Sequence, residues 1–149
     1  MLTPTLQQTV HTAKASSLDN LYVAGPAGDA AFDARVGQTT GNDMLDAAQS
    51  YDCAVIIAVA AEEAKSTDPG TFASHVRDVT TGANRCTTFA LCASLLRQGK
   101  SVVAYVGHTG RLRLDARNEP TSAREILGYF DNRYPAQTQH RDYPVSGSS

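Results

Sequence analysis

The sequence lacks the features that direct a protein into a membrane or onto a nucleic acid. Its longest apolar run, Cys53 to Ala61, has nine residues, whereas a helix needs about 20 to cross the hydrocarbon of a bilayer. The 149 residues contain no basic stripe and carry a formal net charge of −2. We therefore expect no transmembrane segment, and neither nucleic acid nor an anionic membrane surface as a partner.

The N-terminal residues also lack a charged n-region and an apolar h-region, so they do not form a signal peptide. On this ground we expect a cytoplasmic location if the chain is expressed as given. Residues 1–20 are rich in Thr, Ser and Gln and predict a poorly ordered segment.

The chain has little cysteine, and the spacing of that cysteine excludes a zinc site. Cys53, Cys86 and Cys92 form no CxxC pair, and the four histidines are scattered. We predict no metal and no cofactor. Two interpretations stay open: three free thiols, or a disulfide between Cys86 and Cys92 if the turn between them folds back. Such a bond would contribute about 2.4 kcal/mol to the free energy of unfolding. In the cytosol the two thiols would stay reduced.

No motif of nucleophilic or nucleotide chemistry is present. Residues 25–28 precede a helix but have neither GxGxxG nor P-loop spacing, so they indicate a strand-to-helix turn. There is no GxSxG elbow. We predict no catalytic residue and no enzyme.

Single titratable residues have structural explanations. We expect His75 to be a half-exposed helix residue. His108 has no identified partner in its loop and is expected to be solvated, with a catalytic role as the alternative. Glu62 and Glu63 are adjacent, about 100° apart around a helix, and are expected to solvate its end.

The pattern of apolar residues predicts one early strand, several helices and two or three late strands. The expected helices are 28–36, 42–65, 68–81 and 88–98, and the expected strands are 21–24, 101–106, 111–115 and 124–130. Residues 25–26 should stop the first strand, and residues 132–149 should form a flexible tail.

The longest of these helices is expected to be capped by Asn42 or Asp43, and to be buried on every side because its middle is apolar all round. Asp68-Pro69 is a strong start signal for the next helix, with Phe72, Val76 and Val79 on its inner face. The last helix should place Phe89, Cys92 and Leu96 inward and end at Gly99.

One early strand before four helices is an unbalanced α/β pattern. A complete doubly wound sheet alternates strands and helices, so we expect a piece of an α/β domain. The apolar helix would need another surface to cover it, which a homodimer could supply.

Six short motifs occur in an order that resembles the type I periplasmic solute-binding proteins of ABC importers, the branched-chain amino-acid and amide receptors. They lie at residues 21–35, 49–54, 66–68 with 76–80, 85–92, 107–115 and 120–123. The fourth is similar to a "K-C-T-S-F-x-E-C" motif in which the two cysteines are placed to pair. The match spans about residues 15–130 and resembles the C-terminal part of such a receptor.

The resemblance implies an incomplete solute-binding lobe over residues 21–131. It also implies a function in binding an amino-acid-like solute and delivering it to a membrane permease, outside the cytoplasm. No ligand contact transfers residue by residue, so the ligand-binding residues stay unknown. The alternatives are a small regulatory or enzymatic α/β module, or a remnant without activity.

Overall fold

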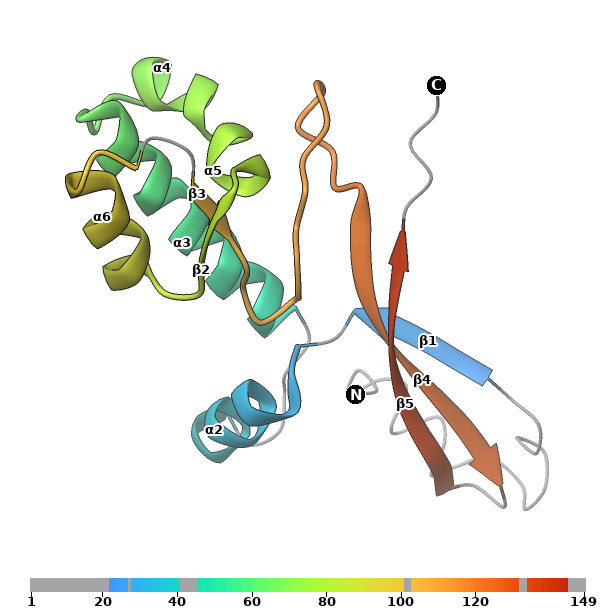
Figure 1. Cartoon of the computed structure of the whole chain (residues 1–149). Helices are drawn as coiled ribbons and strands as arrows, with labels where there is room; N and C mark the ends of the chain where they lie inside the picture. Colours follow the sequence, from blue (N-terminus) through green and yellow to red (C-terminus); the bar gives the residue numbers. More distant parts are fainter. Residues whose placement is uncertain (1–21, 27, 41–45, 101–102, 132–133, 145–149) are drawn as a thin grey trace.

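The strands form two separate sheets (Figure 1). The structure is a computed structural model that describes residues 22–26, 28–40, 46–100, 103–131 and 134–144. One sheet has the antiparallel order β1 (Tyr22–Pro26), β4 (Ser122–Asp131) and β5 (Tyr134–Pro144). The other is a parallel pair of β2 (Asn84–Cys86) and β3 (Val103–Tyr105). The chain is thus a mixed domain of helices and strands with a parallel pair, in general agreement with the predicted α/β class.

The helices are α2 (Ala30–Thr40), α3 (Ala47–Ala64), α4 (Pro69–Phe72), the 3₁₀ helix η1 (Ala73–His75), α5 (Asp78–Thr81) and α6 (Phe89–Arg97). Helices α3 to α6 gather around the parallel pair, α2 lies apart from them, and the three-stranded sheet lies to one side (Figure 1). The central helix α3 contacts α4, η1, α5 and α6, while α5 and α6 both contact β3. We call the body formed by α3–α6 with β2 and β3 the α/β unit.

Helix α3 begins later than the sequence predicts and ends where expected. Its N-cap is Asp46 and not Asn42 or Asp43, which lie outside the described residues. Asp46 has a φ of 57° and its side chain makes no capping hydrogen bond. At the other end, Lys65 adopts the left-handed conformation, and its amide donates to carbonyls of the last turn.

The expectation that α3 is buried on every side is wrong. Ile56, Val59 and Ala60 are buried, but Cys53 is exposed and Ile57 is 42% exposed. The elements that contact α3, which are α4, η1, α5 and α6, leave these two side chains uncovered. The core therefore joins one face of α3 to the parallel pair; its buried members are Ile56, Val59, Ala60, Val79, Cys86, Cys92, Val103 and Tyr105.

The helix predicted over 68–81 has the expected start and the expected inner face, but it is interrupted. Asp68 accepts the amide of Thr71 at 2.9 Å, and Val79 is buried in the core. Hydroxyl groups bond to carbonyls three residues earlier, as Ser74 does to Thr71 at 3.2 Å. Such bonds compete with the helical ladder, and the segment divides into α4, η1 and α5.

β2, α6 and β3 form a β-α-β unit whose helix begins and ends within about one residue of the predicted range. Thr88 accepts the amide of Leu91 at 3.2 Å. After Arg97 the chain turns at Gly99, with a φ of 78°, and its amide donates to the Leu96 carbonyl at 3.0 Å. The expected inner position of Phe89 is wrong, because this side chain is 41% exposed.

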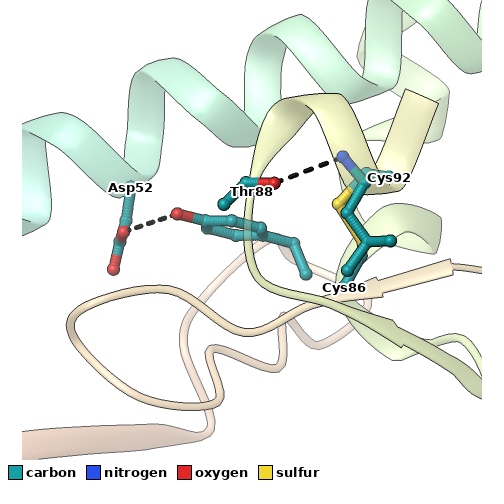
Figure 2. Close-up of a disulfide and its surroundings, with 6 residues drawn as sticks. Asp52, Cys86, Thr88 and Cys92 are labelled. Carbon is teal, nitrogen blue, oxygen red and sulfur yellow. Dashed lines mark hydrogen bonds between the residues drawn. A yellow bond between two sulfur atoms is a disulfide. The ribbon is translucent and has the colours of Figure 1, made fainter. Parts of the chain in front are cut away.

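A disulfide joins Cys86 at the end of β2 to Cys92 in α6 (Figure 2). The two Cα atoms are 5.1 Å apart, and both side chains are fully buried. This is the pair that the sequence analysis marks as the disulfide candidate, while Cys53 is free and exposed. The bond fixes the crossover helix to the strand that precedes it.

The three-stranded sheet contains two departures from the sequence predictions. Gly25 and Pro26 do not stop the first strand but belong to β1, pairing with Ile126 and Glu125. Proline is tolerated there because β1 is an edge strand. The expected flexible tail is instead largely β5, whose backbone pairs along the whole length of β4. Residues 1–20 lie outside the described residues.

Residues 111–115, predicted as a strand, form one arm of a tight loop. The Asp115 carboxylate accepts the amides of Arg117 at 2.8 Å and Glu119 at 2.9 Å, and Asn118 adopts a left-handed φ of 61°. These local hydrogen bonds replace a strand ladder.

We expect Cys86→Ala/Cys92→Ala to lower the free energy of unfolding by about 2.4 kcal/mol, because the unfolded chain loses a closed loop. Urea denaturation without reductant measures this change. Cys53→Ala is the matched control and should stay within about 0.5 kcal/mol of the parent, since Cys53 is exposed. Equal effects of the two changes would contradict a stabilising bond.

Candidate functional site

The chain passes between its two bodies twice, and the two passages meet beside α3. The first connection, residues 27–46, leads from β1 to α3 and contains α2. The second connection, residues 106–121, leads from β3 back to β4, which pairs with β1. The place where they meet, which we call the junction, is built from Asp29, Phe32, Tyr51, Asp52, Tyr105 and residues 107–109.

Asp52 is the centre of the junction. Its side chain is 2% exposed, and its Oδ1 atom accepts the Tyr105 hydroxyl at 2.8 Å and the His108 amide at 3.0 Å. Its Oδ2 atom accepts the Thr109 amide at 2.7 Å and the Thr109 hydroxyl at 2.6 Å. Four donors thus replace the water that this carboxylate loses on burial.

Tyr105 lies at the end of β3 and its side chain is fully buried. Burial raises the pKa of the Tyr105 hydroxyl far above its ordinary value, and the hydrogen bond to Asp52 and the charge of Asp52 raise it further. The hydroxyl therefore stays protonated and donates to Asp52, which points from α3 toward it (Figure 2).

Two glycines allow the connections to lie this close to α3. A Cβ atom at Gly107 would overlap the carboxylate of Asp52. A Cβ atom at Gly28 would stand 2.8 Å from the Cβ of Ala48, which is closer than real Cβ atoms come. The absence of a side chain at one position on each connection is thus a condition for the junction.

Asp29 and His108 join the two connections directly. The His108 Nδ1 atom lies 2.6 Å from the Asp29 Oδ2 atom, and the other Asp29 oxygen accepts the Phe32 amide at 2.8 Å. Burial acts to raise the pKa of Asp29, but these hydrogen bonds and the attraction to His108 outweigh it, so the pKa lies below its ordinary value. The carboxylate is thus held in its charged form.

Three rings pack around this contact. The ring centroid of His108 lies 4.5 Å from that of Phe32 and 5.2 Å from that of Tyr51. Phe32 and Tyr51 are 5.5 Å apart and tilted by 58°. Because the rings come from α2, α3 and the second connection, they hold three segments at one point.

The polar atoms of the junction bind one another and join both connections. Within the described residues, no group of three or more His, Cys, Asp or Glu side chains could hold a metal ion. None of the described helices combines the length and the apolar content needed to span a bilayer.

The sequence patterns do not predict this junction. His108, expected to be a solvated loop histidine with no identified partner, is 25% exposed and contacts the Asp29 carboxylate. Asp52 directly precedes the apolar run Cys53 to Ala61, and no role is predicted for it. The available signal was the resemblance, since Tyr51-Asp52, Asp29 and His108 belong to three of its six motifs.

Glu62 and Glu63 lie at the other end of α3 and differ in environment. Glu62 pairs with Arg97 at 2.9 Å and Lys65 at 3.5 Å at the surface. The Glu63 side chain is 13% exposed, with His75 Nδ1 at 3.4 Å, and its buried Oε2 atom has no hydrogen-bond partner among the described residues. The expectation that both solvate the helix end therefore holds only for Glu62.

The two carboxyls titrate in opposite directions. Burial raises the pKa of Glu63 by more than the charge and hydrogen bond of His75 lower it, and the negative charge of Asp78 makes a smaller contribution in the same direction as burial. The hydrogen bond from Arg97 lowers the pKa of Glu62, with further attraction from Arg97 and Lys65, against a smaller effect of burial. His75 is 35% exposed, as the sequence analysis expects.

Comparison of the chain with protein-family models, with curated proteins and with solved structures found no match in any of the three.

Removing the charge of Asp52 should cost more stability than removing any one of its donors. We expect Asp52→Asn to lower the free energy of unfolding by about 3 kcal/mol, because an amide group then faces buried donors. Tyr105→Phe should cost about 1.5 kcal/mol, since the carboxylate keeps its other bonds. Urea denaturation at pH 7 measures both.

Asp46→Asn is the control for Asp52→Asn, because Asp46 is exposed and its side chain makes no capping bond. It should change stability by less than about 0.5 kcal/mol. An Asp52→Asn variant as stable as this control would show that the buried network does not hold the junction together.

Glu63→Gln and Glu62→Gln should change stability in opposite directions at pH 7. The folded chain holds the Glu63 proton more tightly than the unfolded chain, so stability falls as pH rises from 4.5 through the raised pKa. Glutamine does not ionise and so removes this loss. Glu63→Gln should therefore be more stable than the parent at pH values above the raised pKa, and should gain no stability below pH 4.5.

The lowered pKa of Glu62 has the reverse effect, because its contribution is present above 4.5 and disappears as pH falls through the lowered value. Glu62→Gln should therefore lower stability at pH 7 and have no effect in strong acid. Thermal unfolding from pH 3 to pH 8 tests both variants, and a loss of stability in Glu63→Gln at pH 7 would count against its raised pKa.

Proposed function

We propose that the chain is part of the solute-binding component of an ABC-type importer for branched-chain amino acids, amides or related small solutes. It would act as a binder and not as an enzyme, with the solute and a membrane permease as its partners. Its finer fold would be an incomplete type I solute-binding lobe. Receptors of that family have two α/β lobes joined by a hinge, which closes on the ligand.

The observation that carries this proposal is the double passage of the chain between its two bodies. β1 and β4 pair side by side in one sheet, while everything from α3 to β3 belongs to the other body. Two neighbouring connections between two bodies are the usual construction of a hinge. The junction lies where both connections meet the α/β unit.

The contacts between the motifs give further support. Residues 21–35 supply Asp29 and Phe32, residues 49–54 supply Tyr51 and Asp52, and residues 107–115 supply Gly107 to Thr109. These segments are far apart in the sequence, yet they are joined by hydrogen bonds and ring contacts. Three of the motifs on which the resemblance rests therefore form one structural unit.

The disulfide favours a location outside the cytoplasm. Bonds of this kind persist in oxidising compartments and are reduced in the cytosol. We therefore propose an extracytoplasmic location, in agreement with the location that the resemblance implies, over the cytoplasmic one expected from the missing signal peptide.

Exposed apolar side chains favour a second candidate, a homodimer. Ile57 on α3 and Phe89 and Leu91 on α6 are each more than 40% exposed. Apolar side chains left uncovered on neighbouring helices are typical of a surface that another protein covers. A second copy could cover them in a remnant without transport activity.

The test is the shift in melting temperature when solutes are added to the full chain. With L-leucine, L-isoleucine, L-valine or a short aliphatic amide at 100 times its dissociation constant, the free energy of unfolding should rise by about 2.7 kcal/mol. D-Leucine and glucose are the controls. A chain that responds to none of these solutes and sediments as a dimer would refute the importer function and support the second candidate.

A further inference from the structure

We propose that the contact between Asp29 and His108 is a latch that fixes the angle between the β1-β4-β5 sheet and the α/β unit. This inference deepens the proposed function, because a two-lobed receptor needs a hinge with a defined resting angle. It gives the pair a positioning role that is separate from any contact with a solute.

The position of the two residues suits this role. Asp29 follows the end of β1 by three residues, and His108 follows the end of β3 by three residues. Each therefore lies where the chain leaves one of the two bodies. Their contact, with His108 Nδ1 2.6 Å from Asp29 Oδ2, closes a bridge between the starts of the two connections.

A further hydrogen bond holds each of the two residues in place. The second carboxylate oxygen of Asp29 accepts the amide of Phe32 at 2.8 Å, at the start of α2. The backbone amide of His108 donates to the buried Asp52 at 3.0 Å. Because each side chain extends from a fixed point, the contact between them determines how the two connections lie relative to each other.

The latch is more accessible than the buried carboxylate of Asp52 beside it. The side chains of His108 and Asp29 are 25% and 36% exposed, whereas Asp52 is 2% exposed. Water can therefore replace the partners of Asp29 and His108 without opening the core. The bonds of Asp52 would persist while the latch opens, so the latch can change state while the α/β unit stays folded.

The experiment measures the distance between the two bodies in the absence of any solute. One spin label is placed on Cys53, the free and exposed thiol of α3, and the other on a cysteine introduced by Gln139→Cys in β5, opposite Leu127 of β4. We expect a narrow distance distribution for this labelled parent. His108→Ala should lose the narrow peak and give a broad distribution.

Two further variants separate the latch from a general loss of structure. His108→Asn keeps an N–H donor near the Nδ1 position and should retain more of the narrow peak than His108→Ala does. Asp29→Asn keeps an oxygen for the Phe32 amide but loses the charge, and should broaden the distribution less than His108→Ala. His75→Ala is the control, because His75 and its partner Glu63 both belong to the α/β unit, and should leave the distribution unchanged.

An unchanged distribution in both His108→Ala and Asp29→Asn, with helical circular dichroism as in the parent, would overturn the latch. This outcome is independent of solute binding. If no solute shifts the melting temperature but His108→Ala broadens the distribution, the importer proposal fails while the latch stands. If a solute binds and the distribution never changes, the latch fails alone.

Discussion

The junction depends on one buried charge. Asp52 is the only charged side chain among those described that is buried, and an ionised carboxylate without donors in such a place would be very costly. The chain meets this requirement with a tyrosine hydroxyl from β3 and with two amides and a hydroxyl from the second connection. The path of residues 107–109 is therefore set by Asp52, and His108 reaches Asp29 only because this path is fixed.

Different interactions stabilise the α/β unit and the three-stranded sheet internally. The unit has a common core and a disulfide between β2 and α6, and its central helix buries one face against them. The sheet is defined by backbone pairing of β4 with both of its neighbours. Between the two, the junction combines the buried hydrogen-bond network of Asp52 with the more exposed contact between Asp29 and His108.

Local chemistry in the sequence predicts the helix ends well, because a cap depends on a few neighbouring residues. Asp68 with Pro69 starts α4, Thr88 caps α6, and Gly99 follows its end. Strands depend on partners that the sequence does not reveal. β2 has only three residues without an apolar pattern, and β5 follows from pairing with β4 rather than from its own composition.

Sequence reasoning identified the cysteine pair but not the junction. Cys86 and Cys92 are six residues apart, so a local turn brings them together. Asp29 and His108 are separated by 79 residues, and Asp52 and His108 by 56. Contacts over such distances follow from the tertiary fold. The apolar run of α3 led to a wrong prediction of burial for the same reason, because the elements that pack against the helix determine which of its faces are covered.

Hydrogen exchange of the backbone amides of His108 and Thr109 in the unmodified chain tests the central role of Asp52 most directly. Both amides lie in a loop, where exchange is normally fast, but they donate to a buried carboxylate. The account predicts protection comparable to that of the Val106 amide, which bonds to the carbonyl of Cys86 in the core. Exchange as fast as in an open loop would contradict it.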